Sequence, residues 1–161
     1  MGCITSEGFV TRYSERNGNV LAASFQDDFA IGTRRNGQSL KLEFAHGHTL
    51  IQAQGERGLW TASTTEYIYE VADERDDLIA TFHWHPVSRL AGDEMRWPHV
   101  HACGARDNLT LHKLHLPTGC VSIEAVVRFL IEDLDVIPRR DDWHAVLDRH
   151  EAAFRRSRTW A

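Results

Sequence analysis

The period of the hydrophobic residues changes once along this chain, and that change limits the folds it can adopt. Before residue 120 apolar residues alternate with polar ones, as at Leu40, Leu42 and Phe44, which is the pattern of a half-buried strand. After Ser122 the spacing becomes helical, and the apolar positions are Ile123, Val126, Val127, Leu130 and Leu134. Strands first and helices last predict an α+β domain, in which a curved antiparallel β-sheet is followed by two C-terminal helices packed on one face.

Two hairpins are predicted in the strand region. In "SLKLEFAHGHTLIQAQ" the alternation is interrupted at residues 45–48, where glycine favours a tight turn. In the second hairpin, Tyr67, Tyr69 and Val71 alternate before an acidic turn at 73–77, and a return strand over 79–85 ends at Pro86 because proline cannot donate to a ladder. Further short strands are expected at "PHVHACG" and "LTLHKLHL".

The C-terminal region carries signals for where two helices start and stop. Ser122 is a natural N-cap for the first, which Pro138 ends. Asp141 or Asp142 is expected to cap the second, whose predicted buried stripe is Trp143, Val146, Leu147, His150 and Phe154. At 161 residues the chain is expected to form one domain over 1–161, rich in strands over 1–120 and helical over 121–161.

Charge and cysteine content restrict the classes of function. The formal net charge is −5, so nucleic-acid binding would need a local basic patch. The one candidate patch is the group Arg149, Arg155, Arg156 and Arg158, which we interpret as a solvated helix end. Three cysteines without a CxxC pair favour a reducing cytoplasm over a disulfide scaffold, and no apolar run is long enough to cross a bilayer.

The first residues, "MGCITS", fit a myristoylation pattern in which Cys3 would take a second acyl chain. No basic residues follow the pattern, and a membrane anchor of this kind is usually supported by a second signal. We therefore expect no membrane partner, and the sequence leaves open whether the start is acylated.

Two His-x-His pairs stand out, His83 with His85 and His99 with His101, because they place four imidazoles within 19 positions. Alternate side chains share a face of a strand, so each pair points one way. Phe82, Trp84, Val100 and Ala102 then point the other way. If the two strands are neighbours, the four histidines converge on the face of the sheet away from the core.

Such a cluster supports three readings. His83, His85, His99 and His101 can supply three nitrogen ligands to zinc, with a carboxylate from Asp93 or Glu94 in the intervening loop. Without metal, two histidines can act as base and acid around a scissile phosphate, as in metal-free ribonucleases. In the third reading the rings bridge backbone groups and have a packing role only.

Other residues are assigned around this cluster. Arg89 and Arg96 would contact substrate phosphate, with Arg106 as a further candidate, and Trp97 would line the pocket. His46 and His48 are expected to be exposed at a turn, and His150 to lie in the core or a helix seam. His112 and His115 would join the cluster only if their strand is adjacent to it.

From about residue 40 to 134 the layout resembles the TumE-type family of bacterial toxins. The similarity is in the order of a "SLKLEFAHGHTL"-like hairpin, a "YIYEV" strand, an aromatic strand, a "PHVH" segment and a short helix such as "SIEAVVRFL". The matching residues are Trp84, His85, Pro98, His99 and His101. This chain departs from the family where His85-Pro86 follows the tryptophan and in its second C-terminal helix. The resemblance implies a toxin–antitoxin context, an RNA-directed activity and an antitoxin partner.

Three functions therefore follow from the sequence. The first is a histidine-based hydrolase, a nuclease-like toxin that acts on RNA or another phosphodiester, with His83, His85, His99 and His101 as catalytic residues. The second is a zinc protein that uses the same histidines as ligands. The third is a non-enzymatic interaction or immunity module whose acidic surface docks a basic partner.

Overall fold

The computed structural model of the protein describes residues 2–13, 21–52, 60–86, 97–103 and 115–157. In these residues seven strands form one antiparallel sheet, in which strand order follows chain order, and two helices come after them. The strands are β1 (Phe9–Tyr13), β2 (Leu21–Thr33), β3 (Ser39–Gln52), β4 (Trp60–Asp73), β5 (Leu78–Trp84), β6 (His99–Ala102) and β7 (Leu116–Pro117). The helices are α1 (Ile123–Glu132) and α2 (Trp143–Ser157). The predicted α+β class is confirmed.

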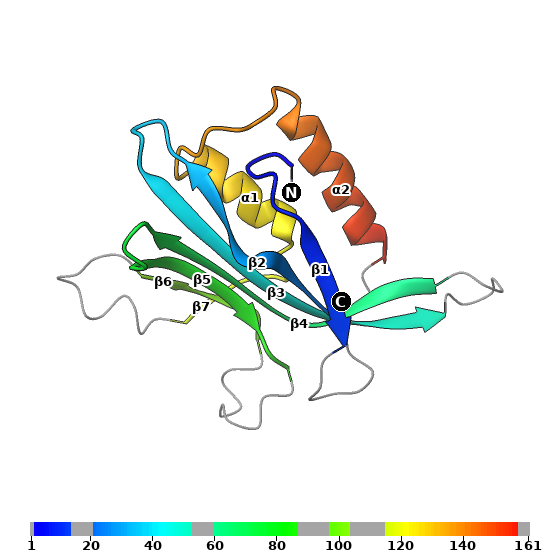
Figure 1. Ribbon diagram of the computed structural model, residues 1–161. Helices are drawn as coiled ribbons and strands as arrows, with labels where there is room; N and C mark the ends of the chain where they lie inside the picture. The colour runs from blue at the N-terminus through cyan, green and yellow to red at the C-terminus, as the bar shows by residue number, and fades with distance from the viewer. Residues whose placement is uncertain (1, 14–20, 53–59, 87–96, 104–114, 158–161) are drawn as a thin grey trace.

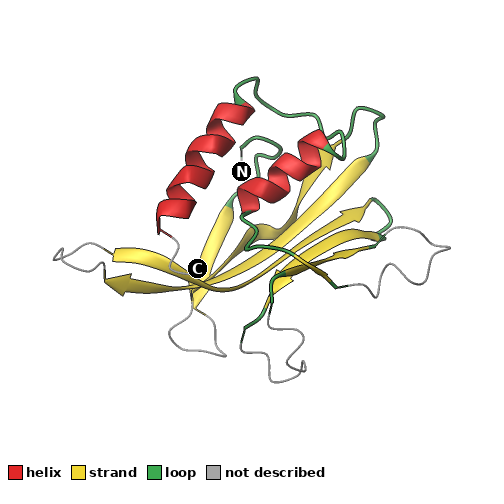
Figure 2. Ribbon diagram, turned by 180° about the vertical axis from the view of Figure 1, so that it is seen from behind, coloured by secondary structure: helices red, strands yellow, loops and turns green. Residues whose placement is uncertain are grey.

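Both helices cover the same face of the twisted sheet, as Figures 1 and 2 show from opposite sides. The alternation in the strands explains this layering. Leu40 and Leu42 of β3 and Tyr67, Tyr69 and Val71 of β4 are buried, and they pack with the apolar face of α1, formed by Val126, Val127, Leu130 and Ile131. Each large apolar side chain buried in this layer contributes roughly 1.5–3 kcal/mol to folding. The other face is free of helices in the part of the chain that the structure describes.

The first predicted turn, at residues 45–48, is wrong. β3 runs without interruption from Ser39 to Gln52, and its pairing with β4 shifts between Gly47 and His48, where β4 carries an extra residue. Gly47 has no positive φ, and a Cβ there would lie 2.7 Å from Cγ of Glu66. The glycine therefore allows a close approach at a β-bulge and does not form a turn. His46 and His48 are consequently half-buried strand residues, not exposed turn residues.

The second hairpin is confirmed. Its turn separates β4, which ends at Asp73, from β5, which begins at Leu78, and Asp76 adopts a left-handed φ of 63°. The "PHVHACG" strand is present as β6. Most of "LTLHKLHL" lies outside the described residues, and only its end contributes to β7.

Both helices begin as the spacing predicts, but α1 ends at Glu132, so Leu134 and Pro138 lie beyond its end. Ser122 caps α1, since its Oγ accepts from the Ala125 N–H at 3.2 Å. In α2, Leu147 is buried, and Trp143, Val146 and Phe154 are partly buried. His150 was expected to be buried on the same stripe, but it is exposed, because an open cavity lies between this part of α2 and the sheet.

The N-terminal segment belongs to the core. Cys3 is fully buried and Ile4 nearly so, and the backbone N–H of Arg139 donates to the Cys3 carbonyl at 2.7 Å. A thiol in this position is not accessible to an acyl chain in the folded protein. Among the described residues, neither helix combines the length and the apolar character that a membrane crossing requires.

The cap at Ser122 gives a first prediction about stability. Ser122→Ala should lower the free energy of unfolding by about 1 kcal/mol, because the Ala125 N–H loses its acceptor. Ser39→Ala, at the start of β3, should change the same quantity by less than about 0.5 kcal/mol. Urea denaturation of both variants checks this, and equal effects at the two serines would contradict the role of the cap.

Candidate metal centre

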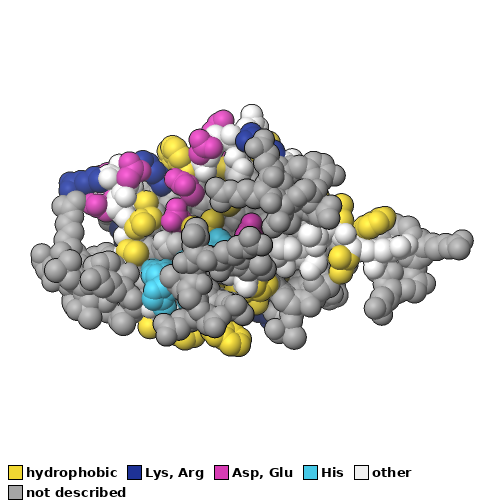
Figure 3. Space-filling view, turned by 90° about the horizontal axis from the view of Figure 1, so that it is seen from below, with side chains coloured by type: hydrophobic (Ala, Val, Ile, Leu, Met, Phe, Trp, Pro, Cys, Tyr) yellow, Lys and Arg dark blue, Asp and Glu magenta, His cyan; other side chains and the backbone are white. Residues whose placement is uncertain are grey.

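β5 and β6 are adjacent antiparallel strands, and their register brings both His-x-His pairs together. His83 is opposite His99, and Thr81 is opposite His101. The intervening Phe82 faces the helices, where its ring meets Phe129 with centroids 5.7 Å apart. The histidines therefore point to the helix-free face, as the alternation predicts. Figure 3, which views the molecule from below, shows histidine side chains gathered at the surface on this side.

Three of these imidazoles are close enough to share one ion. His83, His99 and His101 each offer a ring nitrogen, and these three atoms lie within 4.8 Å of one another. The Nε2 atoms of His83 and His101 are 2.8 Å apart, a hydrogen-bond distance. Tetrahedral zinc with bonds of 2.0–2.1 Å would hold its nitrogen ligands about 3.3 Å apart, so small ring movements suffice to complete a site.

His99 has the most informative environment. It is 4% exposed, and its Nδ1 lies 2.7 Å from the Trp97 carbonyl oxygen. A carbonyl can only accept, so Nδ1 carries the proton and Nε2 of the neutral ring carries a lone pair. Within the described residues that Nε2 is buried and has no hydrogen-bond partner. A histidine whose tautomer is fixed by a backbone carbonyl, with its other nitrogen unpaired, has the arrangement of a metal ligand.

The protonation state of His83 agrees with this arrangement. Burial, together with repulsion from the neighbouring imidazoles, that of His99 first, lowers the pKa of His83 to about 4. The ring is therefore neutral at pH 7, the form in which an imidazole binds a cation, and a shared ion would replace its 2.8 Å contact with His101.

The remaining members of the cluster lie around these three rings. The ring of His85 is 5.5 Å from that of His83, and its Nδ1 is 3.6 Å from Oε2 of Glu66. His115 directly precedes β7, and its exposed ring lies 4.3 Å from the His101 centroid and 4.9 Å from that of His99. The structure thus brings three of the four predicted histidines into one group, with His85 at its edge. It also adds His115, because its strand is adjacent to β6.

A groove of about 980 Å³ extends from His83 and His101 across the helix-free face. Among the charged residues that the structure describes in its lining, the four acidic ones, Glu70, Asp73, Glu74 and Asp77, outnumber the two cations, Arg34 and Arg75. Burial raises the pKa of Glu70, and the nearby Glu43 raises it further. The groove therefore offers a negative potential beside the histidines.

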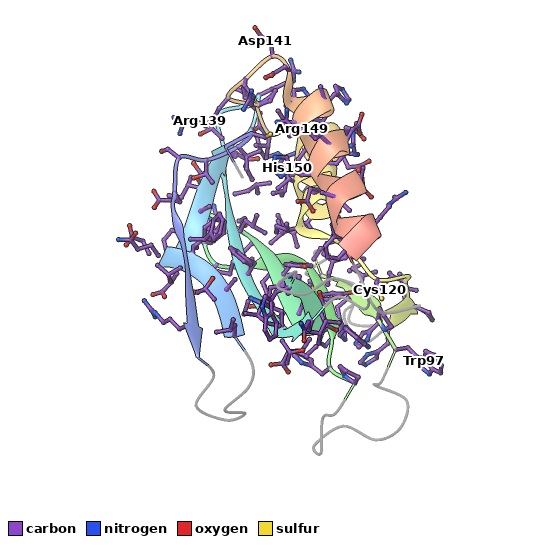
Figure 4. The ribbon with its side chains drawn as sticks, turned by 90° about the vertical axis from the view of Figure 1, so that its right-hand side faces the viewer. Trp97, Cys120, Arg139, Asp141, Arg149 and His150 are labelled. Atoms are coloured by element: carbon purple, nitrogen blue, oxygen red, sulfur yellow. The ribbon has the colours of Figure 1, made fainter. Side chains whose placement is uncertain are left out.

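The structure does not describe the arginines that the sequence assigns to phosphate binding. Arg89, Arg96 and Arg106 lie outside the described residues, as do Asp93, Glu94 and His112. Trp97 is 71% exposed, and Figure 4 shows it projecting from the body of the protein. What Trp97 contributes to the cluster is its backbone carbonyl, which side-chain patterns do not reveal.

The arginines near the C-terminus behave as a helix end in solvent where they are described. Arg149 and Arg155 are exposed, and the Arg155 guanidinium donates to Glu151 at 2.6 Å. Arg158 and the side chain of Arg156 lie outside the described residues.

Comparison with known proteins gave no match: no family model, no curated protein sequence and no solved structure is significantly similar to the chain. The resemblance to the TumE-type toxins is untested by these comparisons and stays a prediction. Function is therefore argued from the site alone.

Proposed function

We propose that the protein is a zinc-dependent hydrolase whose metal ion is held by His83, His99 and His101. The observation that carries this proposal is the buried, unpaired Nε2 of His99, in a group where His83, His99 and His101 each offer a ring nitrogen within 4.8 Å of the others. A buried acceptor without a partner costs roughly 1–3 kcal/mol, and a shared cation removes that cost. Packing alone gives no reason for placing this lone pair among other imidazoles.

The ligand set indicates the metal and the type of chemistry. Three imidazole nitrogens suit zinc better than the oxygen-seeking magnesium or calcium. Three protein ligands leave the fourth tetrahedral position open, as in catalytic rather than structural zinc sites. In such a site zinc lowers the pKa of a bound water to about 7 and so supplies a nucleophile for hydrolysis.

His85 is placed to move the proton of that nucleophile. Its ring centroid lies 5.5 Å from that of His83, and Oε2 of Glu66 lies 3.6 Å from its Nδ1, just beyond hydrogen-bond distance. We predict that His85→Ala lowers kcat about 10²- to 10⁴-fold, the usual contribution of an acid–base group, while zinc content stays unchanged. Steady-state kinetics with metal analysis of the same samples checks this. A variant that loses zinc together with activity would instead make His85 a ligand.

The metal-free alternative has less support from the geometry. Two histidines that act as base and acid on a phosphodiester must leave space for the phosphate between them. His83 and His101 are in direct contact at 2.8 Å. RNA also carries a dense negative charge, which the acidic groove would repel. RNA cleavage and the toxin context thus rest on the sequence resemblance, and we keep RNA as one substrate to be assayed.

The test of the hydrolase uses untagged protein, loaded with zinc or stripped with a chelator. The substrates are 4-nitrophenyl acetate, bis(4-nitrophenyl) phosphate and a single-stranded RNA. We expect zinc-dependent turnover of at least one substrate by the wild type, its loss in His99→Ala, and its retention in His144→Ala, which changes an exposed histidine on α2. Turnover that survives in His99→Ala, or a zinc-loaded protein inactive on all three substrates, would contradict the proposal.

The acidic groove favours a second candidate, a module that docks a basic protein such as an antitoxin. If the protein is such a module, a partner should co-purify with it and be released by salt, because surface charges are screened at high ionic strength. Charge reversal at Glu74 and Asp77, both exposed in the groove, should then weaken capture of that partner. Capture that is insensitive to salt and to these changes would exclude docking through the groove.

A further inference from the structure

A second cavity lies on the opposite side of the sheet from the histidine cluster. It has a volume of about 340 Å³, within the range of small-molecule sites. Residues from the first four strands and from both helices line it, so it lies between the sheet and the helix layer and opens to solvent. Figure 4 shows His150, one of its lining residues, on α2 beside the sheet.

The apolar wall of this cavity consists of side chains that the core leaves incompletely covered. Phe44, Ile123 and Phe154 are only partly buried, and Phe9 is 60% exposed. The Phe44 ring is held edge-on by the fully buried Phe25, with centroids 4.7 Å apart. Aromatic rings fixed in this way offer a preformed surface for a flat apolar molecule.

Polar groups occupy one part of the cavity. The His46 ring lies between two hydroxyls, with Nε2 2.9 Å from Oγ1 of Thr64 and Nδ1 3.3 Å from the Tyr69 hydroxyl. Burial lowers the pKa of His46 to about 4, so this ring is neutral at pH 7. Thr64 lines the cavity together with His46, and its hydroxyl retains hydrogen-bonding capacity.

The charge of the lining selects the ligand. Among the described residues of the lining, Glu124 is the one carboxylate and none is a lysine or arginine. A bound anion would face Glu124 without a permanent cation to balance its charge. A hydroxyl or amine donor, in contrast, finds acceptors in the Thr64 oxygen and the Glu124 carboxylate.

We propose that this cavity binds a flat aromatic molecule of one or two rings that is not an anion and carries one hydrogen-bond donor. The rings lie against Phe44 and Phe154, and the donor meets Thr64. The site is separate from the histidine cluster, so its occupancy does not depend on zinc.

A matched pair of probes tests the charge and shape of the ligand. In titrations followed by ¹H–¹⁵N spectra, 2-naphthol should bind saturably below about 1 mM, as expected for a ligand of this size in an apolar pocket. 2-Naphthoate, which has the same rings and a carboxylate, should bind at least tenfold more weakly. Chelation of zinc should leave both results unchanged. Absence of naphthol binding, or equal binding of the two probes, would overturn the proposal.

Two variants locate the bound probe. Ala62→Trp places a large ring in the cavity and should abolish naphthol binding, whereas Ala45→Trp makes the same change on the helix-free face of β3 and should preserve it. Thr64→Val keeps the shape of the side chain and should weaken binding several-fold through loss of the hydroxyl. If Ala62→Trp does not fold, Thr64→Val and Ala45→Trp decide the case. Unchanged binding in Thr64→Val, or a loss in Ala45→Trp, would place the probe elsewhere.

Discussion

His99→Ala is expected to weaken zinc binding by a factor on the order of 100 to 1000. Structural zinc sites with four protein ligands bind with roughly 10–16 kcal/mol, so a single ligand accounts for about 3–4 kcal/mol. The variant also removes a ring whose tautomer is fixed by a backbone carbonyl, that of Trp97. Competition titration with a chromophoric chelator measures the affinity, and circular dichroism shows whether the fold is intact.

The control for this prediction is His144→Ala. His144 is exposed on α2, stacked on Trp143 with ring centroids 3.5 Å apart, and lies in a different part of the fold from the cluster. Its replacement should leave zinc affinity within about a factor of two of the wild type. Equal affinities of His99→Ala and the wild type would exclude His99 as a ligand.

The second large effect concerns stability in mild acid. His46 has a pKa of about 4 in the folded protein, mainly because of burial and secondarily because of His48, against 6.5 as its ordinary value. Between these values the unfolded chain binds the proton and the folded protein does not, so stability rises with pH. The contribution is fully present above pH 6.5 and is lost as pH falls from 6.5 through about 4. We expect His46 to account for about 2–3 kcal/mol of the unfolding free energy lost between pH 7.5 and 4.5.

His46→Gln isolates this contribution, because glutamine can hydrogen-bond to Thr64 and Tyr69 but does not titrate. The groups that face His46 are His48 on the same strand, Thr64, Tyr67 and Tyr69 on β4, and Phe154 on α2, with Glu124 and His150 elsewhere in the cavity. Urea denaturation at the two pH values should show a smaller acid loss in His46→Gln than in the wild type, and an unchanged loss in His144→Gln. Equal losses in all three proteins would show that burial of His46 does not control acid stability.

The order of strands and helices could be predicted because it depends on local period. The alternation at Tyr67, Tyr69 and Val71 and the helical spacing after Ser122 directly reflect which side of each element is buried. The bulge at residues 45–48 was predicted as a turn, because glycine is common in both turns and β-bulges. Only the contact with Glu66 across the sheet distinguishes the two.

The candidate site was predictable in part for the same reason. Two alternating pairs on consecutive strands must share a face once the strands pair, which places His83, His99 and His101 together. The role of His115 depends on the pairing of β6 with β7, and the fixed tautomer of His99 depends on a backbone carbonyl. The second cavity could not be predicted from the sequence. The helical spacing of His150 and Phe154 is the same whether the space between helix and sheet is filled or empty.

The central claim is that three imidazoles share one zinc ion. Anomalous diffraction at the zinc absorption edge, on crystals of the untagged protein grown with one equivalent of zinc, tests it most directly. We expect a single strong peak, 2.0–2.1 Å from one ring nitrogen each of His83, His99 and His101. A peak at other residues, or no peak between these rings, would contradict it.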